Sequence, residues 1–323
     1  MPLIRYSLPH IEARGLKPTT SLDDARTVKT FESREGKVKL VRTKGRGFSP
    51  GKLRIIKLVR HSNTYDPPHE AKVISRLVKS HDNIIEVYAA ELTFNGEGLT
   101  CFEYCTGGDL FNQMKRFDKM GMAAPPLFAL HVWIGMAEAL AFLHHGLIYE
   151  KGKYVKVSND PSLVHSDVKE DNVFLRFPGQ IPGLPDIVLS DFGLSNYPWN
   201  ALPGNGCVYY MSPECKYDTV PHLTHKTDIY SLGVMMREIL HRTGSEWKTG
   251  RDHRDAVVNG LYKGLGFTDV LQGCLISNIR DRRDFSSAHF PGLLGHILDF
   301  RHERKAGIKD GAKIDPKCWA PDR

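Results

Sequence analysis

The sequence lacks any uninterrupted apolar run of the roughly 18 residues that would predict a transmembrane helix. Its first residues, Met1 to Arg5, also lack the apolar core of a secretory signal peptide. Pro2 excludes N-myristoylation, and the last four residues contain no prenylation cysteine. We therefore expect a soluble intracellular protein, cytoplasmic and/or nuclear, with no insertion into a membrane.

Paired metal ligands are also missing. The six cysteines form no CxxC pair and no zinc-binding spacing, so in a reducing compartment we expect free thiols that mostly pack as small buried residues. The 15 histidines include no HExxH motif and no cluster with ligand spacing. For most of them we expect structural or surface roles.

Acidic residues are scarce in one part of the chain. The net charge is +7, and between Arg34 and Arg60 the only acid is Glu35. A solvated, positively biased sheet surface is the favoured explanation, and a contact with nucleic acid or an anionic membrane is the alternative. The length of 323 residues suits either a two-lobed catalytic unit or two separate domains.

Short β-like runs precede mainly helical sequence, which predicts an α+β fold with two lobes. Residues 1–27 are expected to form an N-terminal extension, 28–300 a single domain divided near residue 105, and 301–323 a polar C-terminal tail. The expected strands are 37–43, 53–59, 84–90, 98–103, 173–175 and 187–189. The expected helices are 70–79, 127–144 and 228–240, and residues 146–161 are read as a surface insertion.

The residues with the clearest chemistry lie in the second half. Phosphoryl transfer from ATP needs a carboxylate to orient the acceptor hydroxyl, oxygen ligands for Mg²⁺, and a cation near the transferred group. Asp167 suits the first role, Asn172 and Asp191 the second, and Lys169 the third. Gly193 permits the sharp turn that would aim Asp191.

These residues carry a resemblance to eukaryotic protein kinases over roughly residues 28–300. The family's H-R-D-L-K-x-x-N loop is matched by 165–172, its D-F-G by 191–193, its A-P-E by 212–214 and its D-x-W-S-x-G helix by 228–233. The resemblance implies transfer from Mg-ATP to a protein substrate, with Asp167 as catalytic base. Lys169 resembles the serine/threonine type, and 206–214 is similar to NIMA-related kinases.

The resemblance also assigns residues to nucleotide binding. Lys57 would contact the α- and β-phosphates and pair with Glu70, while Phe102 would be the gatekeeper. Asp228 would hold the catalytic loop, and Glu214 would pair with Arg282 or Arg283. Further nucleotide contacts are implied for Gly36, Val38 and Ile55, for the hinge residues Glu103 and Cys105, and for Asp109 at the ribose.

Several positions depart from the family pattern. Only Gly36 and Val38 match the glycine-rich loop over 31–38, so phosphate contacts would be weaker. Ser166 replaces an arginine that usually receives an activation-segment phosphate, and Cys207 replaces a threonine beside the catalytic aspartate. Two alternatives stay open: a pseudokinase that binds nucleotide or regulates a partner, and a small-molecule kinase, which would lack Lys169 and the 212–214 element.

Overall fold

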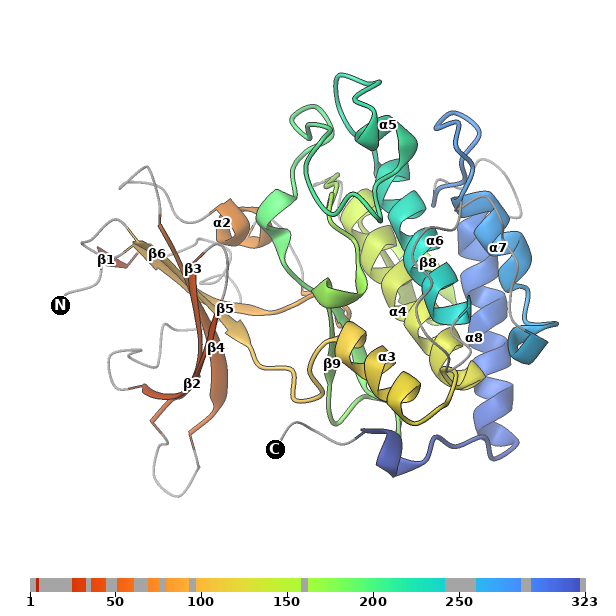
Figure 1. Ribbon diagram of the computed structural model, residues 1–323, viewed down its shortest axis with the longest axis horizontal. Coiled ribbons are helices and arrows are strands. Elements are labelled where there is room, and N and C mark those ends of the chain that lie inside the picture. The colour runs from red at the N-terminus through yellow and green to blue at the C-terminus, as the bar shows by residue number, and fades with distance from the viewer. Residues whose placement is uncertain are drawn as a thin grey trace. The chain divides into compact units, whose positions relative to one another are not determined.

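The computed structural model describes residues 4–5, 25–32, 36–44, 51–60, 69–75, 80–92, 97–157, 162–241, 260–285 and 292–319. Its contacts divide the chain into two compact units (Figure 1). The N-terminal unit contains residues 1–80 and 85–104, and the C-terminal unit contains 81–84 and 105–323.

The N-terminal unit is an antiparallel sheet accompanied by one described helix, α2 (His69–Ser75). The sheet has six strands in the order β1-β5-β6-β4-β3-β2. Buried side chains of Val41, Ile56 and Leu99 pack together on it, because alternate residues of a strand face the same side. The strands are β1 (Ile4–Arg5), β2 (Arg26–Glu32), β3 (Gly36–Arg42), β4 (Leu53–Arg60), β5 (Val87–Leu92) and β6 (Glu97–Glu103).

The predicted strands of this unit are present, with one shift and two additions. The strand expected from residue 84 begins at Val87, and Ile84 instead forms an isolated bridge with Leu189. Strand β1 pairs with β5, although residues 1–27 are expected only as an extension. Strand β2 lacks an apolar alternation because residues 26–30 are exposed. The last part of the helix expected over 70–79 lies outside the described residues.

The C-terminal unit is mainly helical and contains two small hairpins, β7–β8 and β9–β10. Its α-helices are α3 (Leu110–Lys119), α4 (Pro126–His145), α5 (Pro213–Lys216), α6 (His225–His241), α7 (Phe267–Cys274) and α8 (Leu293–Lys309). Its strands are β7 (Leu147–Glu150), β8 (Lys153–Lys156), β9 (Val173–Arg176) and β10 (Asp186–Leu189). Its 3-10 turns are η2 (Glu170–Asn172), η3 (Phe192–Leu194), η4 (Gly260–Tyr262) and η5 (Pro316–Trp319).

Helix α4 is the centre of this unit and packs against α6, α8 and β10 (Figure 1). Pro126 occupies its first turn, where no backbone donor is needed, and Gly146 ends it with φ 66°. By length and composition α4 could cross a membrane, but 89% of its most apolar window is buried inside the protein. The apolar sequence of α4 is therefore explained by its position in the core of this unit.

Two segments predicted to lie at the surface contact the helical core. Residues 146–161, read as an insertion, include the hairpin β7–β8, which is fastened to the helical core: Tyr154 Oη donates to Glu138 Oε1 at 2.7 Å. The tail predicted to begin at residue 301 instead begins within α8. Arg301 of this helix contacts the core, since its Nε also donates to Glu138 Oε1, at 2.6 Å. Beyond α8, the Trp319 ring of η5 packs 5.1 Å from the ring of the buried Phe128.

Candidate active site

The hairpin β9–β10 brings two of the predicted functional residues together. Asn172 immediately precedes β9, and Asp191 follows β10 after Ser190. Val173 pairs with Leu189, and the Ser190 N–H donates to the Asn172 carbonyl at 2.9 Å. The antiparallel register therefore places the two candidate metal ligands at the same end of the hairpin.

The Asp167 carboxylate accepts three hydrogen bonds. Lys169 Nζ lies 2.5 Å and Asn172 Nδ2 2.9 Å from Asp167 Oδ2, and the Cys207 backbone N–H donates to Oδ1 at 3.1 Å. These contacts fix both the position and the rotation of the carboxylate. Cys207 thus contacts Asp167 through its backbone amide, so this contact does not require the threonine hydroxyl that the family pattern predicts.

The ammonium group of Lys169 is held in its charged form. Burial by itself would lower the Lys169 pKa, but the hydrogen bond and the negative charge of Asp167 outweigh this effect and raise it. The charge of Asp191 acts in the same direction. Lys169 therefore provides a permanent cation beside two carboxylates, as stabilisation of a phosphoryl group requires.

Asn172 and Asp191 fit the requirements of a magnesium site. Asn172 Nδ2 donates to both the carbonyl and Oδ2 of Asp167, at 2.8 and 2.9 Å. The Asn172 Oδ1 atom therefore lies on the side of the amide that faces away from these two acceptors. Asp191 has a left-handed backbone, with φ 60° and ψ 73°, which is uncommon for a residue other than glycine. An amide oxygen and a carboxylate are hard ligands that suit Mg²⁺.

Asp228 of α6 holds the loop that carries Asp167. Its Oδ2 accepts the backbone N–H of His165 at 2.7 Å, and its Oδ1 accepts that of Ser166 at 2.9 Å. His165 Nε2 lies 3.0 Å from the Ser190 carbonyl, which links the loop to the segment before Asp191. Ser166 has φ 68°, a left-handed conformation that these contacts stabilise. The predicted role of Asp228 in holding this loop is confirmed by the contacts.

The segment after Asp191 approaches the loop most closely at Gly206. A Cβ atom there would lie 2.8 Å from the Ser166 carbonyl oxygen and 3.3 Å from Asp167 Oδ1, and Gly206 has φ 110°. Only glycine allows this approach without strain, and it brings the next amide, that of Cys207, onto Asp167. Ser195 of the same segment is fully buried and donates to the His165 carbonyl at 3.2 Å.

The partner of Glu214 is Arg282. Arg282 Nη1 and Nη2 donate to the two carboxylate oxygens at 2.7 and 2.9 Å, and both side chains are buried. Arg283 pairs instead with the exposed Asp269, at 3.1 Å. Of the two arginines that the sequence proposes, the structure thus selects Arg282.

In the N-terminal unit, the predicted ion pair is present: Lys57 Nζ lies 3.2 Å from the carboxylate of Glu70, which is buried. Val38 pairs directly with Lys57 across β3 and β4, and Ile55 pairs with Phe102 across β4 and β6. A Cβ at Gly36 would lie 2.0 Å from the Leu58 carbonyl oxygen, so strand packing alone requires glycine there. Residues 33–35 of the glycine-rich loop lie outside the described residues.

The three remaining nucleotide-binding predictions have structural partners of their own. Glu103 Oε1 accepts the Glu86 N–H at 3.0 Å, and the Cys105 carbonyl accepts the Gly108 N–H at 3.3 Å. Asp109 caps α3 by accepting the Asn112 N–H at 2.8 Å. Their roles in binding nucleotide stay predictions.

Comparison with known proteins identifies the family of this chain. The family model described as "Protein kinase domain" matches residues 35–309. Of two similar curated proteins from Arabidopsis thaliana, the receptor protein-tyrosine kinase CEPR2 is 28% identical over 192 residues, which are 56% of this chain and 17% of that protein. The leucine-rich repeat receptor-like serine/threonine-protein kinase RGI4 is 32% identical over 149 residues, 44% of this chain and 12% of that protein.

The chain therefore spans less than a fifth of the length of these two relatives. The likeness to NIMA-related kinases stays a prediction from the sequence. The family match covers most of the chain. The chain belongs to the protein kinase domain family and has its fold.

Proposed function

We propose that this chain transfers the γ-phosphoryl group of Mg-ATP to serine and threonine hydroxyls of protein substrates. The observation that carries the proposal is the fixed carboxylate of Asp167, with Lys169, Asn172 and the Cys207 amide bound to it. Such a group can orient an acceptor hydroxyl and take its proton during transfer.

The hydrogen bonds indicate which oxygen of Asp167 acts. An ionised carboxylate has about four acceptor positions, two on each oxygen. Lys169 and Asn172 donate to Oδ2, whereas among the described residues Oδ1 accepts one hydrogen bond, from the Cys207 amide. Oδ1 keeps an acceptor position, and we assign it to the substrate hydroxyl.

The other residues would bind the nucleotide and its metal. Asn172 Oδ1 and the Asp191 carboxylate would hold Mg²⁺, which offsets the charge of the phosphates when bound. In the N-terminal unit, Glu70 keeps the Lys57 ammonium in place, at 3.2 Å, for a phosphate contact. The choice of serine and threonine is supported by Lys169 and by the similarity to RGI4, a serine/threonine-protein kinase by name, whereas CEPR2 is named as a protein-tyrosine kinase.

A second candidate is a pseudokinase that binds nucleotide without transferring phosphate. It is favoured by Phe31, a bulky residue of β2 where the family pattern has the first glycine of its loop. The Phe31 residue pairs with Val38 across β2 and β3. A poor phosphate loop would weaken ATP binding without removing the base.

Phosphate transfer from [γ-³²P]ATP with Mg²⁺ to generic protein substrates distinguishes the two candidates. Asp167→Asn preserves shape but not basicity, and we expect its rate to fall by roughly 10²–10⁴. Asp171→Asn is the matched control, because Asp171 is an exposed carboxylate of the same loop and should be replaceable. Label on serine or threonine that disappears only in Asp167→Asn supports the kinase. Mg-ATP binding with no transfer by the unaltered protein supports the pseudokinase, and label on tyrosine alone overturns the substrate class.

A further inference from the structure

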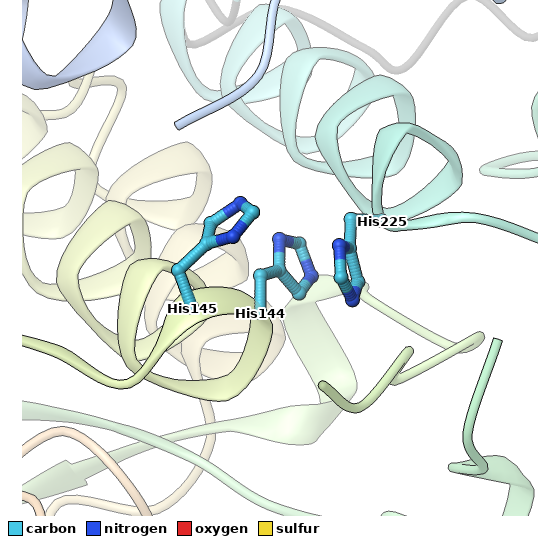
Figure 2. Close-up of side chains that lie close together, drawn as sticks. All are labelled: His144, His145 and His225. Atoms are coloured by element: carbon cyan, nitrogen blue, oxygen red, sulfur yellow. The ribbon is translucent and has the colours of Figure 1, made fainter. Parts of the chain in front are cut away.

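Three histidines lie close together in the C-terminal unit, although their spacing in the sequence matches no metal-binding motif. His144 and His145 end α4, and His225 begins α6. Figure 2 shows their rings side by side, facing one another from the two helices. One ring nitrogen from each lies within 4.8 Å of the others. The sequence contains no ligand spacing for this cluster, because folding brings together residues that are far apart in the chain.

The Nδ1 atom of His144 has no hydrogen-bond partner among the described residues. His144 Nε2 lies 2.9 Å from Asp228 Oδ2, and in the neutral tautomer that donates its proton there Nδ1 is an acceptor. This Nδ1 is buried and has no hydrogen-bond partner among the residues that the structure describes. A buried acceptor without a partner costs free energy, and a bound cation would satisfy it.

The other two rings can also present a nitrogen. His145 Nε2 is buried and likewise has no partner within the described ranges. His225 Nε2 lies 2.6 Å from Ser162 Oγ, and when the ring donates to that hydroxyl its Nδ1 keeps a lone pair. Each ring thus has a nitrogen that can carry a lone pair, and His225 would have to turn out of its stack on His144, whose plane is 17° from its own, for the three lone pairs to converge.

We propose that His144, His145 and His225 form a binding site for a divalent transition metal, with Zn²⁺ as the best-suited ion. Imidazole nitrogens suit zinc, copper and nickel, and three protein ligands leave one position for water. Asp228 completes the arrangement seen around protein-bound zinc, in which a carboxylate accepts the other N–H of a ligating histidine.

The cluster would contract to bind the ion. Zinc–nitrogen bonds of about 2.0–2.1 Å at tetrahedral angles place the nitrogens of each pair about 3.3–3.4 Å apart, which is closer than the 4.8 Å limit of the cluster. His145 and His225 are only partly buried, so their rings can rotate, whereas His144 is fixed by Asp228. Of the charged groups that act on His145, Asp284 favours a cation and Lys156 opposes one.

The competing explanation is that the cluster is only packing, because His144 stacks on His225 with centroids 4.5 Å apart.

Zinc binding to the full-length protein, purified without a histidine tag, tests the site. Zn²⁺ is titrated in competition with a chromophoric chelator, and Co²⁺ is titrated with detection of its visible absorption. The variants are His145→Gln, His225→Gln and the double variant, and His222→Gln is the control because His222 is an exposed histidine near the start of α6. His144 is kept because it also supports Asp228.

We expect one Zn²⁺ per chain, bound at least tenfold more weakly by each single variant and unchanged by His222→Gln. We also expect Zn²⁺ to raise the thermal unfolding midpoint of the unaltered protein but not of the double variant. Equal zinc affinity in the unaltered protein and the double variant would overturn the proposal, as would the absence of binding by a folded protein. If His225→Gln does not fold by circular dichroism, the half-buried His145→Gln alone decides between these outcomes.

Discussion

Replacing Arg282 by methionine should strongly destabilise the C-terminal unit. Methionine preserves much of the buried apolar volume but leaves the Glu214 carboxylate without its two-point partner, formerly at 2.7 and 2.9 Å. It also removes the donors to the carbonyls of Ile276 and Lys226, both at 2.8 Å. The change therefore creates a buried charge and several buried acceptors with fewer partners.

The magnitude follows from the burial of both partners, whose side chains are 0% and 4% exposed. Breaking one side of such a pair costs about 3–5 kcal/mol of unfolding free energy. For a domain of this size each kcal/mol lowers the thermal midpoint by about 2–4 °C, which gives a decrease of about 6–20 °C. The double variant with Glu214→Gln should recover part of the loss, because no uncompensated charge is left.

Differential scanning calorimetry at pH 7 measures these midpoints, and Arg283→Met is the matched control. Arg283 pairs with Asp269, whose side chain is 54% exposed, so its ion pair contributes at most about 1 kcal/mol. Equal midpoint decreases for the Arg282 and Arg283 variants would refute the reasoning. So would a double variant that is no more stable than Arg282→Met.

The pH dependence offers a second check on the same pair. Burial alone would raise the pKa of Glu214, but the hydrogen bonds and charge of Arg282 outweigh it and lower the pKa below 4.5. A carboxylate with a lowered folded-state pKa adds stability above its unfolded pKa and loses it as the pH falls through the folded value. The midpoint difference between the unaltered protein and Arg282→Met should therefore shrink below about pH 4.5.

Three further outcomes are expected. Gly206→Ala should lower kcat with little change in the KM for ATP. The new Cβ would lie 2.8 Å from the Ser166 carbonyl oxygen and displace the Cys207 amide that binds Asp167. An unchanged kcat in steady-state kinetics would contradict this. Glu70→Gln should raise the KM for ATP by about tenfold or more, since one charge-assisted contact is worth about 1.5–3 kcal/mol, and an unchanged KM would exclude the pair from nucleotide binding. Serine/threonine phosphatase treatment should leave activity unchanged, because residues 194–211 contain no threonine and Ser195 is fully buried. A large loss of activity together with loss of a phosphate from that segment would contradict this prediction.

The elements with nearly continuous apolar sequence could be predicted from the sequence, whereas several with solvent-facing residues could not. Helix α4 and the hairpin β9–β10 have nearly continuous apolar residues, because they are enclosed by other elements. Strand β2 and the hairpin β7–β8 carry exposed polar side chains, so neither has the alternation that identifies a strand. Helix α8 extends past the predicted boundary because contacts such as Arg301 with Glu138 hold a polar sequence in place.

The candidate site divides in the same way between side chains and backbone. Asp167, Lys169, Asn172 and Asp191 could be proposed because their chemistry lies in the side chain and their spacing is local. The amide of Cys207 could not, since every residue except proline has one and only the folded chain shows where it points. The choice of Arg282 over Arg283 likewise depends on burial, which two adjacent arginines do not reveal in sequence.

The contacts of the last described residues set a minimum length for biochemical work on the C-terminal unit. A protein ending at residue 300 would lack Arg301 and leave the mostly buried Glu138 without its cation. It would also lack Trp319, whose ring covers the aromatic pair Phe117 and Phe128. Shortened versions should therefore retain the chain through residue 319, and truncation at the apparent sequence boundary would yield an aggregation-prone protein with newly exposed aromatic surface.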